Sequence, residues 1–282
     1  MSSISVSSYV FADTGSEEES RLRLLAGLLD PAHRAAIETA GIRAGHSCLE
    51  VGSGAGTIAE WMAGRVGPDG RVVAADINLS FLGGLSRHTN TTVRRLDVLT
   101  DPLPQAAFDV ITARALLHHL PGRDLVIARL AAALKPGGAL VLVEPDASVS
   151  IANSEAVHRR FWSAWCEWGR SADVDFTLGG KLPTSLRAAG LTVTDVRMEV
   201  PYYTGGSPWA DLYLRTLRAA EPRLGTSIDP DLVSEFEAAS ADPDSWFTSL
   251  GWISVVARQE LGAHGALSAI PRQRERRPGP RT

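Results

Sequence analysis

Cysteine is scarce in this chain of 282 residues, which contains only Cys48 and Cys166. The two lie far apart and neither has a partner at metal-ligand spacing, so the sequence predicts no disulfide framework and no metal site. No apolar run approaches the ~18 residues of a membrane span, and the first residues lack the basic and then apolar pattern of a secretion signal. These absences predict a cytoplasmic protein that does not insert into a membrane.

Positive charge is also sparse outside the last residues. The formal net charge is −4, and residues 261–282 contribute five Arg against one Glu, which leaves −8 for residues 1–260. An acidic body lacks the basic surface that binds nucleic acid, so no nucleic-acid partner is expected. Lysine is rare as well, with 2 Lys against 26 Arg. This bias favours a high-GC bacterial source and, with it, specialised metabolism.

Short apolar runs alternate with helical segments through the first half of the chain. This alternation predicts a parallel, doubly wound sheet. Two later runs add strands, the last of them expected to run antiparallel at the sheet edge. The sequence therefore predicts an α/β, Rossmann-like fold with seven mostly parallel strands. The expected strands cover residues 48–51, 71–75, 92–96, 108–112, 139–143, 191–200 and 252–256.

Helices are expected before and after these strands. Ser16 opens an amphipathic helix, and Pro31 is predicted to begin a second helix that ends at Ala40. The tail is rich in Arg, Pro and Gly and has no periodic apolar face, so it is predicted to be disordered. The expected organisation is an N-terminal helical region at 1–45, a main domain at 46–260 with helical insertions near 151–190 and 208–241, and a tail at 261–282.

A glycine-rich turn follows the first predicted strand. It reads Glu50-Val-Gly52-Ser-Gly54-Ala-Gly56-Thr57, and glycine permits both a tight bend and close approach of a ligand to the backbone. Dinucleotide enzymes usually carry G-x-G-x-x-G, whereas here Thr57 occupies the position of the last glycine. A glycine cluster alone is weak support for a site, since strand-to-helix turns are common.

Carboxylates follow the next two strands. Asp76 ends the second strand, where it can accept hydrogen bonds from both ribose hydroxyls of an adenosine. Asp97 follows the third strand and can accept from an exocyclic adenine amine, with Ile77 and Val98 as apolar walls. Either acid alone is more often a cap or a solvated loop residue. The glycine turn, Asp76 and Asp97 follow the first three strands in order, however, and as a set they place three strand ends around one nucleoside.

Taken together, these motifs resemble those of the class I S-adenosylmethionine-dependent methyltransferases, especially small-molecule enzymes of the ubiquinone/menaquinone-methyltransferase-like group. Two further segments match, Phe108-Asp-Val-Ile-Thr-Ala-Arg114 and Leu134-Lys-Pro-Gly-Gly138. The resemblance spans residues 45–145. It departs from the common pattern at Glu50, where many relatives have Asp.

The resemblance implies S-adenosyl-L-methionine as the cofactor and gives its site residues. It also implies that the predicted helix at 17–40 forms a lid. Tyr9, which precedes this helix, is expected to close over the methyl donor. The cofactor contacts that it implies are Glu50, Gly52, Ser53, Gly54, Asp76, Ile77, Asp97, Val98, Arg114 and Tyr9.

Two adjacent histidines after the fourth strand are candidate catalytic residues. Methyl transfer requires alignment of the nucleophile with the methyl group and, for some acceptors, removal of a proton. Histidine titrates near neutrality, so His118 or His119 could act as the general base. The alternative is that both cap or pack beside Pro121, because neighbours on a turn are not expected to face one site.

Three tryptophans recur at three-residue spacing in the first insertion: Trp162, Trp165 and Trp168. They occupy one helical face. That face either covers an aromatic or polyketide-like acceptor or packs the helix onto the rest of the chain. A homodimer that buries this insertion is a further hypothesis.

The favoured function is S-adenosylmethionine-dependent methylation of a small molecule, with oxygen preferred over nitrogen or carbon. No Asn/Asp-Pro-Pro-Tyr/Phe segment of the nucleic-acid amino-methylating enzymes follows the fourth strand, which again disfavours such a substrate. Three alternatives stay open. They are a methyltransferase-fold cyclase that uses the S-adenosylmethionine pocket without methyl transfer, a nucleotide-dependent oxidoreductase, and a non-catalytic ligand-binding module.

Overall fold

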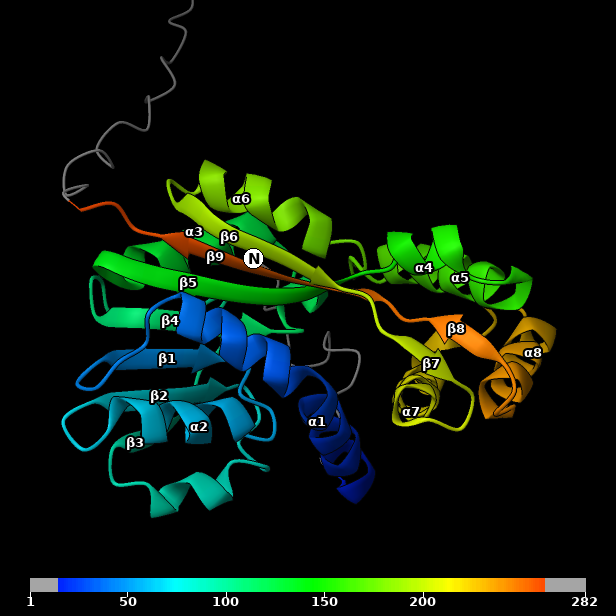
Figure 1. Ribbon diagram of the computed structural model, residues 1–282, viewed down its shortest axis with the longest axis horizontal. Coiled ribbons are helices and arrows are strands. Elements are labelled where there is room, and N and C mark those ends of the chain that lie inside the picture. Colours follow the sequence, from blue (N-terminus) through cyan, green and yellow to red (C-terminus); the bar gives the residue numbers. More distant parts are fainter. Residues whose placement is uncertain (1–14, 262–282) are drawn as a thin grey trace, which may run out of the picture.

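A central sheet of seven strands organises the protein, whose computed structural model describes residues 15–261 (Figure 1). The strands are β1 (Ser47–Val51), β2 (Arg71–Asp76), β3 (Thr91–Arg95), β4 (Phe108–Arg114), β5 (Leu134–Asp146), β6 (Thr192–Glu199) and β9 (Gly251–Arg258). Their order is β3-β2-β1-β4-β5-β9-β6. The predicted α/β, Rossmann-like fold is confirmed.

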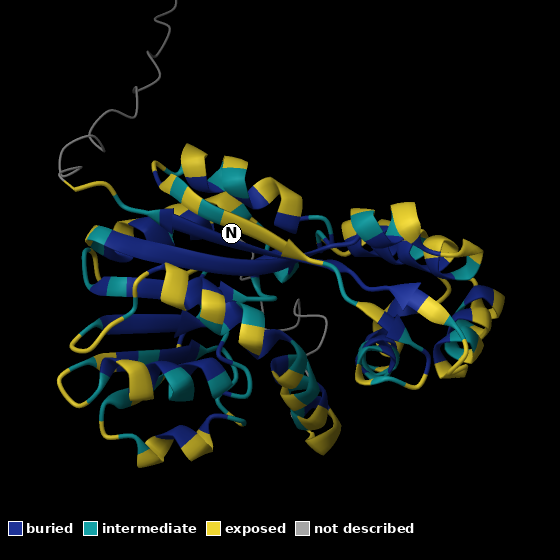
Figure 2. Cartoon of the chain, viewed as in Figure 1, coloured by how far each residue is buried: buried dark blue, intermediate teal, exposed yellow. Residues whose placement is uncertain are grey.

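The strand pairing places the carboxyl ends of five strands at one edge. β1 pairs with β2 and β4 in parallel, as do β2 with β3 and β4 with β5. β9 runs antiparallel to both β5 and β6, so the antiparallel strand lies one position in from the edge. β1 is buried along its whole length and β4, β5 and β9 along most of theirs, whereas β6 is largely exposed (Figure 2). Strands covered on both faces need the continuous apolar runs seen in the sequence.

Helices cover both faces of the sheet. On one face, α2 (Thr57–Val66) buries Ile58 and Met62, and the second half of α1 (Ser16–Thr39) adds Ile37. On the other face, α3 (Arg123–Ala133) and α6 (Leu182–Ala188) bury Leu130 and Leu186. Within residues 15–261 there are also three short 3-10 turns: η2 (Gly83–Arg87), η3 (Leu117–His119) and η4 (Gly179–Lys181).

The first helix is continuous, so the prediction that Pro31 begins a second helix is wrong. Proline has no N–H, and Pro31 therefore leaves the carbonyl of Gly27 without its helical donor. Such a gap bends a helix without ending it, and Figure 1 shows α1 changing direction along its length. The half after Pro31 packs on the sheet, while the half before it reaches toward the second lobe.

The second lobe, which we call the cap, lies beyond the carboxyl ends of the strands (Figure 1). It consists of α4 (Ser148–Asn153), α5 (Ala156–Ser171), α7 (Pro208–Leu224), α8 (Pro230–Ala241) and the antiparallel pair β7 (Tyr202–Thr204) and β8 (Trp246–Thr248). The sequence analysis did not anticipate β7 and β8. Within the insertion expected at 151–190, α5 belongs to the cap, whereas α6 packs on the sheet.

The three tryptophans of α5 lie inside the cap. Trp162, Trp165 and Trp168 are each less than 5% exposed. Trp162 meets Tyr213 edge to face at 5.0 Å between ring centroids, and Phe161 stacks on Phe236 at 3.7 Å. These rings are buried by their own chain, so the homodimer hypothesis gains no support from them.

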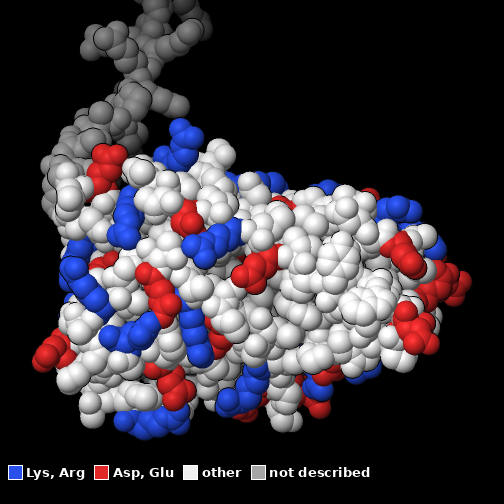
Figure 3. Space-filling view, viewed as in Figure 1, with Lys and Arg blue, Asp and Glu red and all other residues white. Residues whose placement is uncertain are grey.

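The surface mixes charges of both signs. On the face shown in Figure 3, Lys and Arg lie among Asp and Glu and form no continuous basic field. Within residues 15–261, none of the helices combines the length and apolar character that spanning a membrane requires.

Acid is expected to destabilise the cap through His158. This α5 side chain is fully buried and stacks on Phe247 at 3.6 Å, and among the described residues neither ring nitrogen has a hydrogen-bond partner. Burial lowers the pKa of His158 to about 4, against about 6.5 when unfolded. Between these values the unfolded state binds more protons, so this contribution to the free energy of unfolding is lost as pH falls, by about 1.4 kcal/mol per pH unit.

Urea unfolding at pH 7 and pH 5 tests this expectation. Between pH 7 and pH 5, the free energy of unfolding of the wild type should fall by about 2 kcal/mol more than that of His158→Phe. This variant keeps the stacked ring and removes the titrating group. His88→Gln, a change at a partly exposed position, serves as the control. Equal acid sensitivity of the wild type and His158→Phe would rule out His158 as the cause.

Candidate active site

A cavity of about 450 Å³ opens at the carboxyl ends of the strands, between the sheet, the first half of α1 and the cap. This volume lies within the range of small-molecule sites. Nine of the predicted cofactor contacts line it: Glu50, Gly52, Ser53, Gly54, Asp76, Ile77, Asp97, Val98 and Arg114. His118 and His119 line it as well. Tyr9 lies outside the described residues.

The glycine turn and Asp76 hold each other in place. Gly52 and Gly54 have positive φ angles of 72° and 49°, and a Cβ on Gly52 would come within 3.1 Å of the Leu116 side chain. The N–H of Gly54 donates to Asp76 Oδ2 at 2.9 Å, and the N–H of Asn78 donates to Oδ1 at 3.0 Å. Burial raises the pKa of Asp76, and these donors oppose the rise. The second-strand acid therefore faces the bend, as the sequence predicts.

Asp97 is fixed by a local turn after β3. Its Oδ1 accepts from the N–H of Leu99 at 2.9 Å, and its own N–H donates to Asp101 Oδ2 at 2.9 Å. Among residues 15–261, Oδ2 of Asp97 has no hydrogen-bond partner. Val98 beside it is buried. The loop thus presents an acceptor oxygen next to an apolar wall.

Glu50 lies in β1, just before the glycine turn, and one oxygen of its buried carboxyl group has no hydrogen-bond partner among the described residues. Its side chain is 5% exposed, and the oxygen without a partner is Oε2. Burial raises the pKa of Glu50 to about 8, although Arg114 opposes this shift. A buried acceptor of this kind is costly unless a ligand supplies a donor.

Asp30 joins α1 to this end of the cavity, and it is not among the site residues that the sequence predicts. Its Oδ1 accepts from Arg114 Nη1 at 2.8 Å and from Thr57 Oγ1 at 3.2 Å, while Oδ2 accepts from Arg34 at 2.9 Å. Nearby, His33 Nε2 lies 2.6 Å from Thr112 Oγ1. An acid in the middle of a helix gives no sequence signal for such contacts.

Both histidines face the cavity, contrary to the expectation that adjacent residues on a turn would not share one site. The 3-10 turn η3 brings their ring centroids to 3.8 Å. Burial, His118 and the positive charges of Arg21 and Arg123 lower the pKa of His119 well below its usual value. His119 is thus held neutral at physiological pH.

His118 is paired with a buried acid, Glu144 at the end of β5. Nδ1 of His118 lies 2.6 Å from Glu144 Oε2. The carboxylate also accepts the N–H groups of Leu116 and Leu117 through Oε1, at 3.1 and 2.8 Å, and that of His118 through Oε2 at 3.3 Å. Because Glu144 accepts at both oxygens, Nδ1 of His118 is the donor in this pair.

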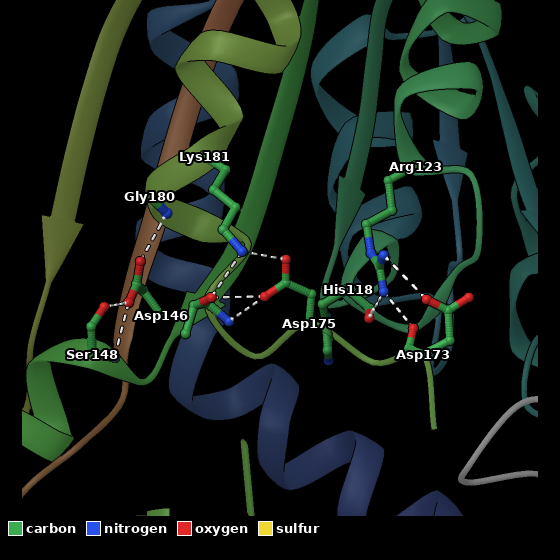
Figure 4. Close-up of polar contacts among 9 residues, drawn as sticks. His118, Arg123, Asp146, Ser148, Asp173, Asp175, Gly180 and Lys181 are labelled. Atoms are coloured by element: carbon green, nitrogen blue, oxygen red, sulfur yellow. Dashed lines mark hydrogen bonds and ion pairs between the residues drawn. The ribbon is translucent and has the colours of Figure 1, made fainter. Parts of the chain in front are cut away.

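The backbone of His118 is held by the segment that returns from the cap (Figure 4). Its carbonyl accepts the N–H of Asp175 at 2.8 Å and Arg123 Nη2 at 3.1 Å. Asp175 is in turn bonded by Lys181 at 2.7 Å. His118 is therefore fixed at its carbonyl, at its N–H and at Nδ1.

The chain belongs to the methyltransferase domain family, whose profile matches residues 20–196. This confirms the resemblance to the class I S-adenosylmethionine-dependent methyltransferases. Among curated proteins, it is 37% identical over 115 residues to a ubiquinone/menaquinone biosynthesis C-methyltransferase of Saccharophagus degradans, covering 38% of this chain and 46% of that protein. The corresponding protein of Cellvibrio japonicus is 36% identical over 118 residues, covering 39% and 47%. The chain thus spans just under half the length of these relatives.

Solved structures share the fold at low sequence identity. The phosphoethanolamine N-methyltransferase 2 of Haemonchus contortus, solved with S-adenosyl-L-methionine, matches with a TM-score of 0.59 and 15% identity, covering 91% of this chain and 61% of that one. The cyclase SpnF matches with a TM-score of 0.54 and 19% identity, covering 83% and 81%.

The cofactor of this family, S-adenosyl-L-methionine, fits the polar groups of the cavity. The cofactor carries an ammonium group, two ribose hydroxyls and an adenine amine, all of which donate hydrogen bonds. The cavity offers acceptors at Glu50 Oε2, the Asp76 carboxylate and Asp97 Oδ2. Donors of the cofactor therefore meet acceptors of the cavity.

Proposed function

We propose that the protein transfers the methyl group of S-adenosyl-L-methionine to an oxygen of a small molecule, in bacterial specialised metabolism and in the cytoplasm. The observation that supports the proposal is the His118–Glu144 pair, which fixes the ring of a residue that lines the cavity. Alignment alone can drive transfer from a sulfonium, but an oxygen acceptor also has to lose its proton. C-methylation, named for the curated relatives, is the nearest competing outcome.

The cofactor would be held by the strand ends and covered by α1. Glu50 accepts from the ammonium group, Asp76 from the ribose hydroxyls and Asp97 from the adenine amine, with Ile77 and Val98 against the ring. Gly52, Ser53 and Gly54 provide the close backbone approach, and Arg114 is positioned by Asp30. Bound in this way, the cofactor supplies an activated methyl group.

His118 acts as the general base in this proposal. Its Nε2 takes the proton of the acceptor hydroxyl as the new carbon–oxygen bond forms, while Glu144 holds Nδ1–H and stabilises the positive ring that results. His119 and the first half of α1, from Glu18 to Ala26, exclude water from the same cavity. The N-terminal region 1–45 would thus serve as the lid.

Product stoichiometry tests the function. The full chain is incubated with methyl-labelled S-adenosylmethionine and bacterial metabolite extracts, and both products are quantified. Methyl transfer predicts one S-adenosylhomocysteine per methylated product, with the label on oxygen. Product formed while the cofactor stays intact would instead establish the cyclase alternative, and label on carbon would correct the site of transfer.

A further inference from the structure

The sheet has an open edge at β6. This strand is last in the sheet order, and in the described part of the chain it pairs with β9 on one side and with no strand on the other. Figure 1 shows β6 along the outer border of the sheet, leading toward β7. An edge strand presents unpaired N–H and C=O groups to which another strand can bind. The side chains of the edge then decide which strand fits.

Exposed apolar side chains gather along this edge. Six large apolar side chains are exposed among residues 15–261, and four of them lie on β6, β7 and β8. These four, which we call the edge patch, are Val196, Met198, Tyr202 and Trp246, each between 48% and 68% exposed. In Figure 3 few charged side chains lie over β7 and β8. Apolar surface that gathers in one place is a common mark of an interaction site.

The charges of β6 match those of a second copy of the same strand. Asp195 and Arg197 lie on one face and form an ion pair at 2.9 Å, while Val196 between them points to the other face. When two copies pair antiparallel about Val196, Asp195 of each copy lies opposite Arg197 of the other. Moving the centre by one residue places Asp195 opposite Asp195, or Arg197 opposite Arg197, and like charges directly opposite destabilise a pair. The charges therefore favour self-pairing about Val196.

The length of the strand favours the same register. Pairing about Val196 sets residues 193–199 opposite one another, which is nearly all of β6. Pairing about Met198 also opposes unlike charges, Arg197 and Glu199, but it uses only residues 197–199 of the strand. Symmetric dimers repeat one contact patch on both subunits in this way, so that a residue on the axis meets its own copy.

From these observations we propose that the protein forms a two-fold homodimer in which the sheets of two copies join edge to edge through β6, about Val196. The edge patches of both copies extend the interface beyond the paired strands, since specific interfaces bury more than about 1,000 Å². This dimer goes beyond the proposed function, because no residue of β6, β7 or β8 lines the cavity and each copy keeps its own site. It also differs from a dimer through the tryptophans of α5, which are buried in the cap.

Sedimentation equilibrium of the full chain tests the dimer. The wild type is expected to have twice the chain mass of 30.1 kDa. Val196→Lys sets two ammonium groups against each other at the axis and should raise the dissociation constant about tenfold or more. Leu125→Lys, the matched change at an exposed apolar residue of α3, should leave it unchanged. A monomeric wild type, or a dimer that Val196→Lys leaves intact, overturns the proposal.

An exchange of charges tests the register. Arg197→Asp opposes like charges at two places in the dimer and should weaken it about tenfold. Adding Asp195→Arg restores unlike charges at both places and within each strand, so the double variant should dimerise like the wild type. Arg160→Asp, which reverses one charge of the exposed Arg160–Glu235 pair, is the control. A double variant as weak as Arg197→Asp alone would refute pairing about Val196.

Hydrogen exchange distinguishes the other possible occupants of the edge. In the dimer, the amides of β6 should be protected, and Val196→Lys should remove part of this protection. A monomer with the same protection would mean that a segment of the same chain outside residues 15–261 binds the edge. A monomer without it would mean that the edge stays free. Either result excludes a second copy as the partner, and neither affects the stoichiometric test of methyl transfer.

Discussion

Replacing Asp76 with asparagine is expected to weaken S-adenosylhomocysteine binding about 100-fold. The carboxylate accepts from Gly54 and Asn78, one N–H at each oxygen, and in our proposal also receives the ribose hydroxyls. An amide keeps one acceptor oxygen and turns an NH₂ group toward the other backbone donor. Loss of hydrogen bonds to a charged group costs about 1.5–3 kcal/mol, which corresponds to this factor.

Calorimetry with the demethylated cofactor measures the effect directly. Asp69→Asn removes the same charge from an exposed turn and should bind like the wild type. Circular dichroism of both variants checks that the sheet is retained. An Asp76→Asn affinity within threefold of the wild type would show that this acid does not hold the cofactor.

Replacing His118 with glutamine is expected to lower kcat by 10²–10³-fold while S-adenosylhomocysteine affinity stays unchanged. A positioned general base contributes about 10²–10⁴ in rate, and glutamine cannot take the proton. The rise of kcat with pH that a histidine base produces should disappear with it. Glu144→Gln should also lower kcat and alter the pH profile, because an amide no longer fixes the tautomer of His118.

Steady-state kinetics across pH on a hydroxyl acceptor provides the measurement. His88→Gln is the control, because His88 lies outside the cavity and contacts Glu60 instead. His119→Gln distinguishes the two histidines. If this variant abolishes the pH dependence of kcat while His118→Gln retains it, the general base is His119, and Glu144 does not act by orienting the base.

The cofactor end of the site was predictable because parallel topology determines it. Once Glu50, Asp76 and Asp97 are assigned to strand ends, the sheet must bring them to one edge, whatever the loops do. The sequence also marks the glycine turn, since glycine adopts the positive φ angles seen at Gly52 and Gly54 more readily than other residues do.

The rest of the site depends on packing that periodicity does not encode. Glu144 was missed because the predicted strand stopped at Val143, while β5 continues to Asp146. Asp30 and Arg21 belong to a helix whose rotation over the sheet decides which acid meets Arg114. The joint exposure of His118 and His119 to one cavity follows from a single 3-10 turn, a geometry that residue types alone do not specify.

The bend in α1 bears on how small molecules can enter the cavity. The helix is tied to the sheet on both sides of Pro31, by Asp30 just before it, which reaches Arg114, and by His33 just after it, which reaches Thr112. Only the helical turns before Asp30 can move away from the sheet without breaking these hydrogen bonds. We therefore expect small molecules to exchange on the side of the cavity that the first half of α1 borders, with Asp30, His33 and the strand ends left in place.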